Sequence, residues 1–533
     1  MRESSPSSAS ALVARELSKS YGGQTVLDGV DLVASPGLPV GVVGENGVGK
    51  STLLRLLAGI EGADAGEVLL PAGLAYLPQE PTFASSTRVA DVLTEALRPL
   101  HDGVDRLEQL AAGLEDPQTG AEYAGLLDWA VLHDAWGADR RAEAAADRLG
   151  VGALDPLAPV STLSGGQRSR LGLAALVARR SSCVLLDEPT NHLDDAGVDL
   201  LEEFLTGLPG VVVVASHDRA FLESVCREVF DLDPSHFGTD GRGGGRFSGG
   251  YADYLAVKRE ARLRWERAFS SQRSELGALR TAARVSNRRV AHDRPPRDGD
   301  KFIYHAKGEK VAQTISRRVR DSEKRIEAIE QDLIEKPPRE LSFRGAMGSI
   351  RAGGQAVFVR DLVVRGRVSV PSLDVASGEQ LLVTGANGAG KSSLLEVLAG
   401  SLMAESGAVT VSARRVGYLP QHVTFRRPDR TCHEVYVGLT GAEVPLRDLG
   451  LVHPRDVGKP VGLLSVGQQR RLALAVVVAQ QPDLLLLDEP TNHISLVLAD
   501  ELEEALQSTT CTAVLASHDR WLRRGWQGST LAL

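Results

Sequence analysis

The sequence predicts an α/β protein in which one domain occurs twice, with a basic helical hairpin between the two copies. The pattern G-x-x-x-x-G-K-S occurs at Gly44–Ser51 (GENGVGKS) and again at Gly385–Ser392 (GANGAGKS). Each pattern follows a short apolar, strand-like run and precedes a helix-like segment, which is the context that a phosphate-binding loop requires. At 533 residues the chain is also too long for a single hydrophobic core.

The composition is typical of a soluble globular protein, with 43% hydrophobic and 24% charged residues. Residues 1–10 have no apolar core of a signal peptide and are expected to be a disordered lead-in. The longest apolar runs, such as Val211–Ala215, have the length of buried strands and are too short to cross a bilayer. We therefore expect a cytoplasmic protein without a membrane domain. Four cysteines without a C-x-x-C pair are expected to be reduced and mostly buried: Cys183, Cys226, Cys432 and Cys511.

The two copies share a series of landmarks in one order and at nearly constant spacing. In both copies a serine of a Gly-containing motif (LSGGQ or LSVGQ, called the signature below) is followed after 23 residues by the first residue of an Asp-Glu pair. A histidine follows that aspartate by 30 residues. Such a series is not a chance repeat, so we assign the copies to residues 11–250 and 355–533. The paired landmarks are Gln79 and Gln421, the signatures that begin at Leu163 (LSGGQ) and Leu464 (LSVGQ), Asp187-Glu188 and Asp488-Glu489, and His217 and His518.

The first copy is longer between its phosphate loop and its signature. That interval is 119 residues from Gly44 to Leu163 but only 79 from Gly385 to Leu464. The additional residues, about 94–148, are rich in Ala, Leu, Glu and Asp at helical spacing. We expect an inserted helical hairpin there, and a longer helical subdomain fits the pattern equally well.

The segment between the copies, residues 251–345, has a different charge from the rest of the chain. Residues 258–340 contain 22 Lys and Arg against 14 Asp and Glu, whereas the remainder contains 38 against 55. Helical stretches are expected near 251–291 and 308–336, with a Pro/Gly-containing turn between them and a stop at Pro337-Pro338. Low Gly/Ser content argues against a flexible tether, so the pattern predicts a basic antiparallel helical hairpin.

Positive charge in this linker is concentrated at and beside the predicted turn, which also contains Phe302, Ile303 and Tyr304. A basic tip with groups able to stack on bases, attached to acidic domains, favours RNA as a partner. A solvated basic helical pair is the alternative. The basic residues are Arg273, Arg280, Arg284, Arg288, Arg289, Arg294, Arg297, Lys301, Lys307, Lys310, Arg317, Arg318 and Arg320.

The phosphate loops predict two nucleotide triphosphate sites. Glycine backbone wraps the phosphates, the lysine reaches the β and γ oxygens, and the serine hydroxyl ligates Mg²⁺. Tyr21 lies 23 residues before Gly44 and is placed to stack on adenine, whereas the second copy offers only Arg365 and Arg367 near that position. The loop residues expected to contact nucleotide are Gly44, Asn46, Gly47, Gly49, Lys50, Ser51 and Thr52, and Gly385, Asn387, Gly388, Gly390, Lys391, Ser392 and Ser393.

The acidic pairs follow four apolar residues, which places them at the carboxyl end of a buried parallel strand, where ligands of α/β proteins bind. Glu188 and Glu489 are expected to activate the attacking water, and His217 and His518 to contact the γ-phosphate. The signature residues expected to contact nucleotide are Ser164, Gly165, Gly166 and Gln167, and Ser465, Gly467 and Gln468. The expected Mg²⁺ ligands are Ser51, Gln79 and Asp187, and Ser392, Gln421 and Asp488.

These motifs, with LSGGQ, LLDEPTNHLD and SHDR, resemble ATP-binding cassette (ABC) ATPases. The EPTNH wording in both copies, the tandem cassettes and the basic linker resemble the ABC-F family over nearly the whole chain. The resemblance implies a monomer whose cassettes close head-to-tail on two ATP molecules with Mg²⁺. Ser465 would then complete the Lys50 site, and Ser164 the Lys391 site. It also implies ribosome binding, with the linker entering the tRNA exit-site region and contacting rRNA and tRNA.

Two positions depart from the pattern: Val466 replaces a signature glycine, and Ser495 stands where the first copy has Asp194. Both glutamates are kept, so both sites are expected to hydrolyse ATP, and the two departures leave open whether the sites are equivalent. The expected function is displacement of macrolide-, lincosamide- or streptogramin-type antibiotics from the ribosome. Fifty arginines against ten lysines suggest a high-G+C genome, which favours this role. The alternatives are a housekeeping translation factor acting on peptidyl-tRNA or stalled ribosomes, the ATPase subunit of an exporter, and a DNA-repair or chromosome ATPase.

Overall fold

The computed structural model describes residues 11–45, 47–84, 86–191, 193–234, 243–290, 353–386, 388–441, 444–491 and 496–533, and most of 317–337. The predicted lead-in at residues 1–10 and the predicted linker tip, with Phe302, Ile303 and Tyr304, lie outside the described residues. So do Asn46, Asn387 and Ser495. The chain forms two compact units: one holds both copies of the repeat, and the other comprises Pro234–Gly245 and Ala252–Arg339.

The first copy contains a largely parallel sheet and a smaller antiparallel sheet. Apolar runs form the central strands of the large sheet, and every residue of β3, β6 and β7 is buried. The large sheet has the order β5 (Leu74–Leu77), β6 (Cys183–Asp187), β7 (Val211–Ala215), β3 (Val40–Val43), β8 (Glu228–Pro234) and β9 (Gly243–Ser248). The small sheet has the order β2 (Gln24–Ala34), β1 (Leu12–Tyr21) and β4 (Ala65–Leu69).

Helix α1 (Lys50–Leu57) joins these two sheets into one core. Its Leu53, Leu54 and Leu57 are fully buried and belong to the same apolar cluster as Leu17 of β1 and Val213 of β7. Because α1 begins at the lysine of the phosphate loop, burial of its leucines fixes the position of that loop. The remaining helices include α5 (Gly165–Arg179), α6 (Asp195–Thr206) and α7 (Arg219–Val225).

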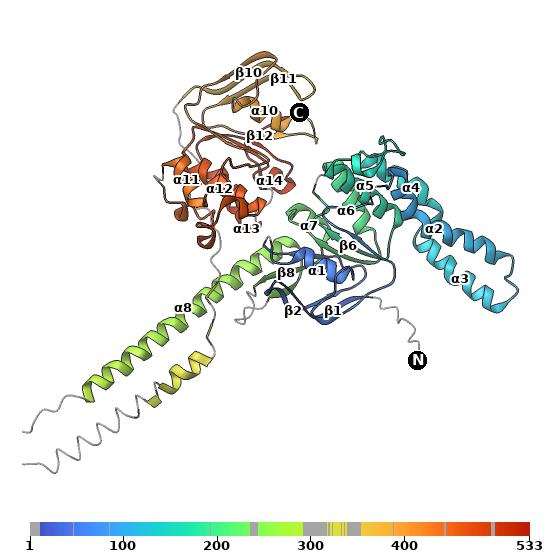
Figure 1. The fold of residues 1–533 in the computed structure, drawn as a ribbon, viewed down its shortest axis with the longest axis horizontal. Coiled ribbons are helices and arrows are strands. Elements are labelled where there is room, and N and C mark those ends of the chain that lie inside the picture. Colours follow the sequence, from blue (N-terminus) through green and yellow to red (C-terminus); the bar gives the residue numbers. More distant parts are fainter. Residues whose placement is uncertain are drawn as a thin grey trace, which may run out of the picture. The chain divides into compact units, whose positions relative to one another are not determined.

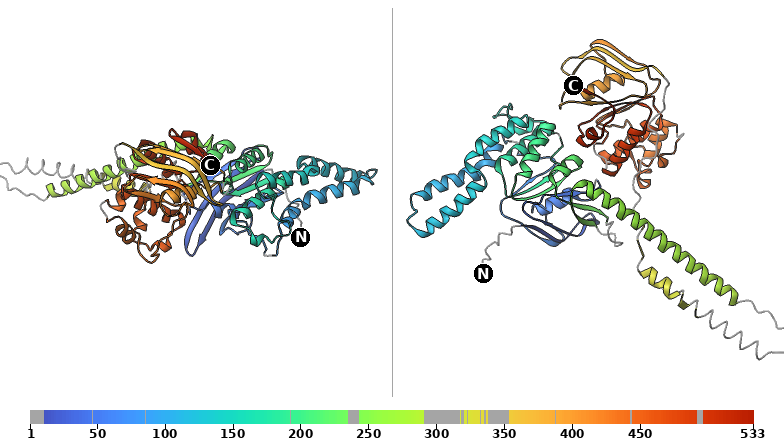
Figure 2. Two further views of the ribbon diagram at one scale, coloured as in Figure 1. Left: turned by 90° about the horizontal axis from the view of Figure 1, so that it is seen from above. Right: turned by 180° about the vertical axis from the view of Figure 1, so that it is seen from behind.

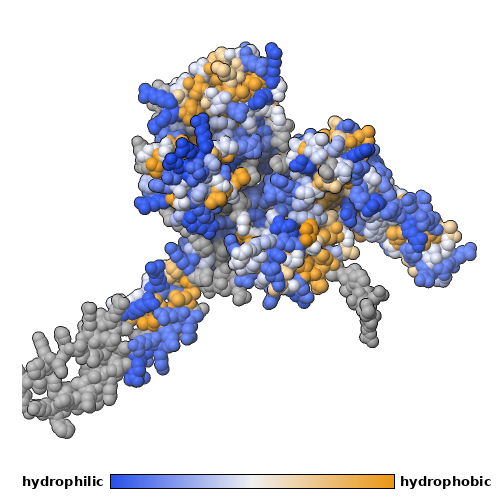
Figure 3. All heavy atoms as spheres, in the orientation of Figure 1, coloured by the Kyte–Doolittle hydropathy of each residue, from blue (hydrophilic) through white to orange (hydrophobic). Residues whose placement is uncertain are grey.

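The additional residues of the first copy are helical. Helices α2 (Val89–Ala111) and α3 (Pro117–Leu132) run antiparallel and project as an arm, which Figures 1 and 2 show. Leu97, Leu100 and Leu107 of α2 form a small core with Ala130 of α3, and α4 (Ala138–Arg148) joins this core at its base. The additional residues thus form a helical hairpin, α2 and α3, that extends from a larger helical layer containing α4. The visible face of the arm is mostly hydrophilic (Figure 3).

The second copy repeats this plan without the arm. In the described residues, one short α-helix, α11 (Cys432–Thr440), followed by short 3-10 turns, occupies the interval in which the first copy has α2 and α3. The other α-helices described in this copy are α10 (Lys391–Leu398), α12 (Val466–Ala479), α13 (Leu496–Ser508) and α14 (Arg520–Gly525). The parallel sheet has the order β14 (Val416–Leu419), β15 (Leu484–Asp488), β16 (Thr512–Ala516), β12 (Gln380–Thr384) and β17 (Ser529–Ala532). The antiparallel sheet has the order β11 (Val368–Ala376), β10 (Gln355–Val364) and β13 (Ser406–Val411).

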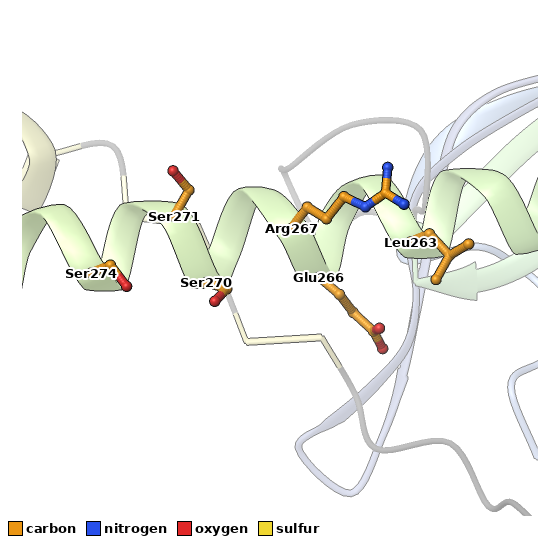
Figure 4. Close-up of a pocket in the computed structure, with 6 residues that line it drawn as sticks. All are labelled: Leu263, Glu266, Arg267, Ser270, Ser271 and Ser274. Atoms are coloured by element: carbon orange, nitrogen blue, oxygen red, sulfur yellow. The ribbon is translucent and has the colours of Figure 1, made fainter.

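The linker begins with helix α8 (Tyr251–Val290), close to the predicted helix over 251–291. Residues 323–331 are also helical. Arg280 of α8 forms an ion pair of 2.7 Å with Glu330, and Gln272 Oε1 accepts a hydrogen bond of 2.9 Å from the Ile334 N–H. The described parts of the two segments therefore lie side by side. With two α/β copies and a helical linker between them, the predicted fold class is confirmed. A hollow on α8 is lined by Leu263, Glu266, Arg267, Ser270, Ser271 and Ser274 (Figure 4).

Two further expectations concern the cysteines and the possibility of membrane-spanning helices. All four cysteines are buried free thiols, as the sequence predicts. Among the described residues, no helix combines the length and the apolar character needed to traverse a bilayer; α8 is long but charged.

Candidate nucleotide sites

The first phosphate loop lies between β3 and α1, with its lysine folded back over it. Gly49 caps α1 at φ 116°, a conformation that other residues rarely adopt, and a Cβ there would lie 2.9 Å from the side chains of Val26 and Leu27. Lys50 is buried, and its Nζ donates to the carbonyl oxygens of Gly44 at 2.8 Å and Glu45 at 3.2 Å. The ammonium group thus occupies the mouth of the loop, where phosphate oxygens would replace these carbonyls.

The second phosphate loop has the same geometry between β12 and α10. Gly390 has φ 104°, and Lys391 Nζ donates to the carbonyl oxygens of Gly385 at 2.9 Å and Ala386 at 3.0 Å. Burial lowers the pKa of Lys50 and of Lys391, while the carboxylates of the neighbouring strand end oppose this shift. The next residues, Thr52 and Ser393, lie in the first turns of α1 and α10.

The acidic pairs lie at the ends of β6 and β15, as the sequence predicts. Asp187 and Asp488 are the last residues of these strands and are 3% and 1% exposed. Glu188 and Glu489 follow in a left-handed backbone conformation, at φ 50° and 51°. Such a conformation is costly for a residue with a side chain and is typical of functional sites.

Each glutamate contacts the histidine that follows the next strand. Glu188 Oε2 accepts the His217 backbone N–H at 3.1 Å, and its Oε1 lies 3.2 Å from His217 Nε2. Glu489 Oε1 accepts the His518 N–H at 3.1 Å and lies 3.7 Å from His518 Nε2. Burial raises the pKa of Glu188 to about 8 and that of Glu489 to about 7. Burial also lowers the pKa of His518 to about 4, so this imidazole is neutral at pH 7.

The strand-end aspartates have the chemistry of a Mg²⁺ site. Burial raises the pKa of Asp187 and of Asp488, and hydrogen bonds from Ser51 and Ser392 oppose this shift. Asp187 Oδ1 and Asp488 Oδ2 are buried and have no hydrogen-bond partner among the described residues. A buried carboxylate oxygen without a partner, beside a serine hydroxyl, fits a divalent cation that prefers oxygen ligands.

The signature motifs begin the helices α5 and α12. Ser164 caps α5: its Oγ accepts the Gln167 N–H, and Gln167 Oε1 accepts the Ser164 N–H at 2.9 Å. Ser465 and Gln468 form the same capping box on α12. Gly165, Gly166 and Gly467 lie in the first turns, whose free N–H groups favour an anion. Val466 is 67% exposed there, so the second signature presents an isopropyl group where the first has Gly165.

The two glutamines that we expect near Mg²⁺ follow β5 and β14. The side chains of Gln79 and Gln421 are exposed, and neither contacts the strand-end aspartates in the described structure. Their backbone carbonyl groups instead face the signature helices. Gln79 O accepts from Ser169 Oγ at 3.5 Å, and Gln421 O accepts from the Arg470 guanidinium.

Tyr21 lies at the end of β1 with 42% of its surface exposed. Its hydroxyl donates to Glu61 at 2.5 Å, and Lys19 Nζ lies 5.6 Å from the ring centroid. The hydroxyl is therefore anchored, while the ring stays accessible for stacking on a base. In the second copy, Arg365 and Arg367 pair with Glu405 and Glu396.

Replacement of Tyr21 by alanine is expected to raise the KM for ATP of the first site about 10-fold, because stacking of a base on an aromatic ring contributes about 1–3 kcal/mol. The measurement is steady-state ATP hydrolysis with Glu489→Gln present, so that turnover reports the first site. Tyr21→Phe keeps the ring and is expected to retain the KM. An unchanged KM in Tyr21→Ala would show that the ring does not contact the base.

Arginines beside both histidines form ion pairs that the sequence did not indicate. Arg219 is 1% exposed; it contacts Asp500 and Glu503 of α13, and its Nη2 lies 2.9 Å from Asp519 Oδ2. Arg520 pairs with Asp199 at 2.5 Å and Glu202 at 2.8 Å, and Arg523 with Asp195 at 2.8 Å. The SHDR repeat marks Arg219 and Arg520 as equivalent positions, but their partners lie about 300 residues away in the sequence and no local pattern reveals them.

A family model described as ABC transporter matches residues 27–191 and 368–492. The tylosin resistance ATP-binding protein TlrC of Streptomyces fradiae is 40% identical over 552 residues, covering 99% of this chain and 98% of that protein. The energy-dependent translational throttle protein EttA of Mycobacterium tuberculosis is 32% identical, and the aligned region covers 95% of this chain and 88% of that protein.

A solved structure of similar fold is that of the archaeal ribosome recycling factor aABCE1 in complex with the ribosomal stalk protein aP1. It superposes with a TM-score of 0.58 at 17% identity, covering 95% of this chain and 85% of the other. At this identity the likeness shows the fold: two cassettes of this type within one chain.

Proposed function

The chain belongs to the ABC-F family of tandem ATP-binding cassette ATPases, and on that premise we propose that it is a cytoplasmic, ribosome-associated ATP hydrolase that protects the ribosome from antibiotics. ATP hydrolysis to ADP and phosphate follows from the family. The observation that carries the rest is the end-to-end similarity to a tylosin resistance protein, at 40% identity over 99% of this chain. The antibiotic class that we propose is macrolide, lincosamide or streptogramin.

The cassettes provide the hydrolytic machinery in this proposal. Lys50 and Lys391 bind the β- and γ-phosphate oxygens, and the signature helices present their N-terminal N–H groups to phosphate. Ser51 with Asp187, and Ser392 with Asp488, would hold Mg²⁺, with Gln79 and Gln421 joining when nucleotide is present. When bound, this ion would neutralise phosphate charge in the transition state. In its ionised form, each of Glu188 and Glu489 accepts a proton from the attacking water, and His217 and His518 hydrogen-bond the γ-phosphate.

Pairing of the two cassettes within one monomer would complete these sites. Ser465 would act with Lys50, and Ser164 with Lys391. Val466 would then narrow the Lys50 site, because its exposed side chain lies at the helix end that must approach phosphate. We therefore expect the two sites to differ in turnover.

The linker, residues 251–345, is the proposed contact with rRNA and tRNA near the tRNA exit site. The described arginines of the linker support this contact because their ion pairs are exposed to solvent. Examples are Arg264 with Glu260 at 3.2 Å and Arg280 with Glu330 at 2.7 Å. Exposed ion pairs contribute only about 0–1 kcal/mol, so a phosphate backbone replaces them at little cost. ATP binding would favour the ribosome-bound state, and hydrolysis would release it.

The test has two parts. The Glu188→Gln, Glu489→Gln double variant with ATP should sediment with 70S ribosomes, and expression of the wild-type chain in a susceptible host should raise the inhibitory concentration of a drug from the proposed classes. A double variant that does not sediment with ribosomes, or that is retained in the membrane fraction, contradicts ribosome association and favours an exporter subunit or a DNA-directed ATPase.

A second candidate function is a translation factor that acts on peptidyl-tRNA or stalled ribosomes. The observation that favours it is the 32% identity to a translational throttle protein over 95% of this chain. Ribosome binding without any change in drug tolerance would support this role over resistance. Deletion of residues 293–305 separates the linker tip from the ATPase: loss of protection with retained hydrolysis is the result expected from our proposal.

A further inference from the structure

A buried arginine distinguishes the second cassette from the first. Arg470 lies one turn into α12 and is 3% exposed. Its Nη1 donates to the carbonyl oxygen of Gln421, and its Nη2 donates to those of Asp488 and Glu489, the latter at 2.6 Å. The guanidinium is therefore bound by backbone carbonyl groups of two separate segments, the loop after β14 and the end of β15.

These contacts fix the main chain on either side of the proposed water-activating carboxylate. A guanidinium is planar and rigid, so its donors hold the accepting carbonyl groups in one mutual geometry. Glu489 has a left-handed backbone, at φ 51°, which persists only where surrounding contacts determine it. Arg470 supplies such contacts at Glu489 itself and at the residue before it.

The first cassette has the same strand-end arrangement at Glu188 but no arginine at the position equivalent to Arg470. Ser169 occupies the equivalent position, five residues after the signature serine, and its hydroxyl only approaches Gln79 O at 3.5 Å. In the described part of the chain, no arginine side chain donates to the carbonyl of Asp187 or Glu188, yet Glu188 adopts φ 50°. The fold at this place therefore does not require the cation. Because burial of a charge is costly, its presence in one copy points to a local role.

We propose that Arg470 is a positioning residue for ATP hydrolysis at the Lys391–Glu489 site, where it locks the Gln421 loop to the strand end that bears Glu489. The inference rests on the proposed role of Glu489. Arg470 would make the second site the more preorganised of the two, and its loss would lower the kcat of that site, since the guanidinium touches no atom that binds ATP.

The experiment uses the full chain and measures ATP hydrolysis without ribosomes. Arg470→Ser, which installs the residue of the first cassette, is combined with Glu188→Gln so that turnover reports the second site, and separately with Glu489→Gln so that it reports the first. Arg470→Lys keeps the charge without the planar group. Ser169→Ala, in both backgrounds, is the matched control at the equivalent position.

We expect Arg470→Ser to lower kcat about 10-fold in the Glu188→Gln background, with the KM for ATP within about twofold, and to leave the Glu489→Gln background unchanged. Arg470→Lys should restore part of kcat, and Ser169→Ala should have no effect. Equal losses in both backgrounds, or a loss expressed in KM alone, would overturn the inference and show a general structural role. Failure of both glutamine variants to reduce hydrolysis would instead contradict the proposed catalytic glutamates.

Discussion

Replacement of Glu188 and Glu489 together by glutamine is expected to lower ATP hydrolysis by about 10²- to 10⁴-fold while ATP still binds. Both carboxylates are at least 92% buried, since they are 8% and 4% exposed, and both follow a strand-end aspartate. A glutamine keeps the oxygen that accepts the His217 or His518 N–H, so the backbone arrangement is retained. It cannot accept a proton from water, and the loss is therefore confined to the chemical step.

The measurement is steady-state phosphate release together with equilibrium ATP binding on the same preparation. Glu203→Gln is the matched control, because Glu203 is an exposed carboxylate of α6 that pairs with Arg148 and lies outside both sites. It should leave turnover unchanged. Retention of more than about a tenth of the wild-type rate by the double variant would exclude these glutamates as the main bases.

Replacement of Arg219 by alanine is expected to lower the free energy of unfolding by about 3–5 kcal/mol, because it removes the cation from a buried group of carboxylates. Arg219 is 1% exposed, and its partners Asp500, Glu503 and Asp519 are largely buried, with side chains 13–17% exposed. Without the guanidinium these acids have lost their common counter-charge. Thermal unfolding of the full chain followed by circular dichroism should show a Tm lower by roughly 3–5 °C, because the entropy of unfolding grows with chain length.

Arg520→Ala provides the matched control for that variant. Arg520 is the equivalent residue of the second SHDR motif, but it is 18% exposed and its partner Asp199 is 49% exposed. The expected loss is therefore smaller, about 1 kcal/mol. Equal effects of the two substitutions would contradict the view that burial determines the contribution of Arg219.

The destabilisation by Arg219→Ala should also depend on pH. Burial raises the pKa of Glu503 to about 7 in the folded chain, although Arg219 lowers it relative to burial alone. Removal of Arg219 raises this pKa further, whereas the unfolded chain keeps the ordinary value near 4.5. The folded variant thus retains a proton that the unfolded chain releases, so its stability falls as pH rises above 4.5. The loss relative to wild type should be larger at pH 8 than at pH 6.

Local patterns were sufficient to predict the repeat, the strands that carry the sites and the residues at their ends. Lys50, Asp187 and Glu188 are each identified by neighbours within a few positions, and the structure brings them to the carboxyl edge of one sheet. Periodicity likewise predicted α8 to within one residue of its end. It left open how the extra helices of the first copy are arranged, because helical spacing does not specify which helix packs on which.

The sequence by itself determined the two nucleotide folds, since each phosphate loop, strand end and signature is a short motif whose conformation is set by its own glycines, apolar runs and caps. Only the tertiary structure decided which charges meet: Arg219 with Asp500 and Glu503, and Arg470 with the carbonyl groups of Gln421, Asp488 and Glu489. These pairs lie 18 to 284 residues apart in the sequence. An arginine looks the same in sequence whether it reaches solvent or a buried acid, because packing alone directs its side chain.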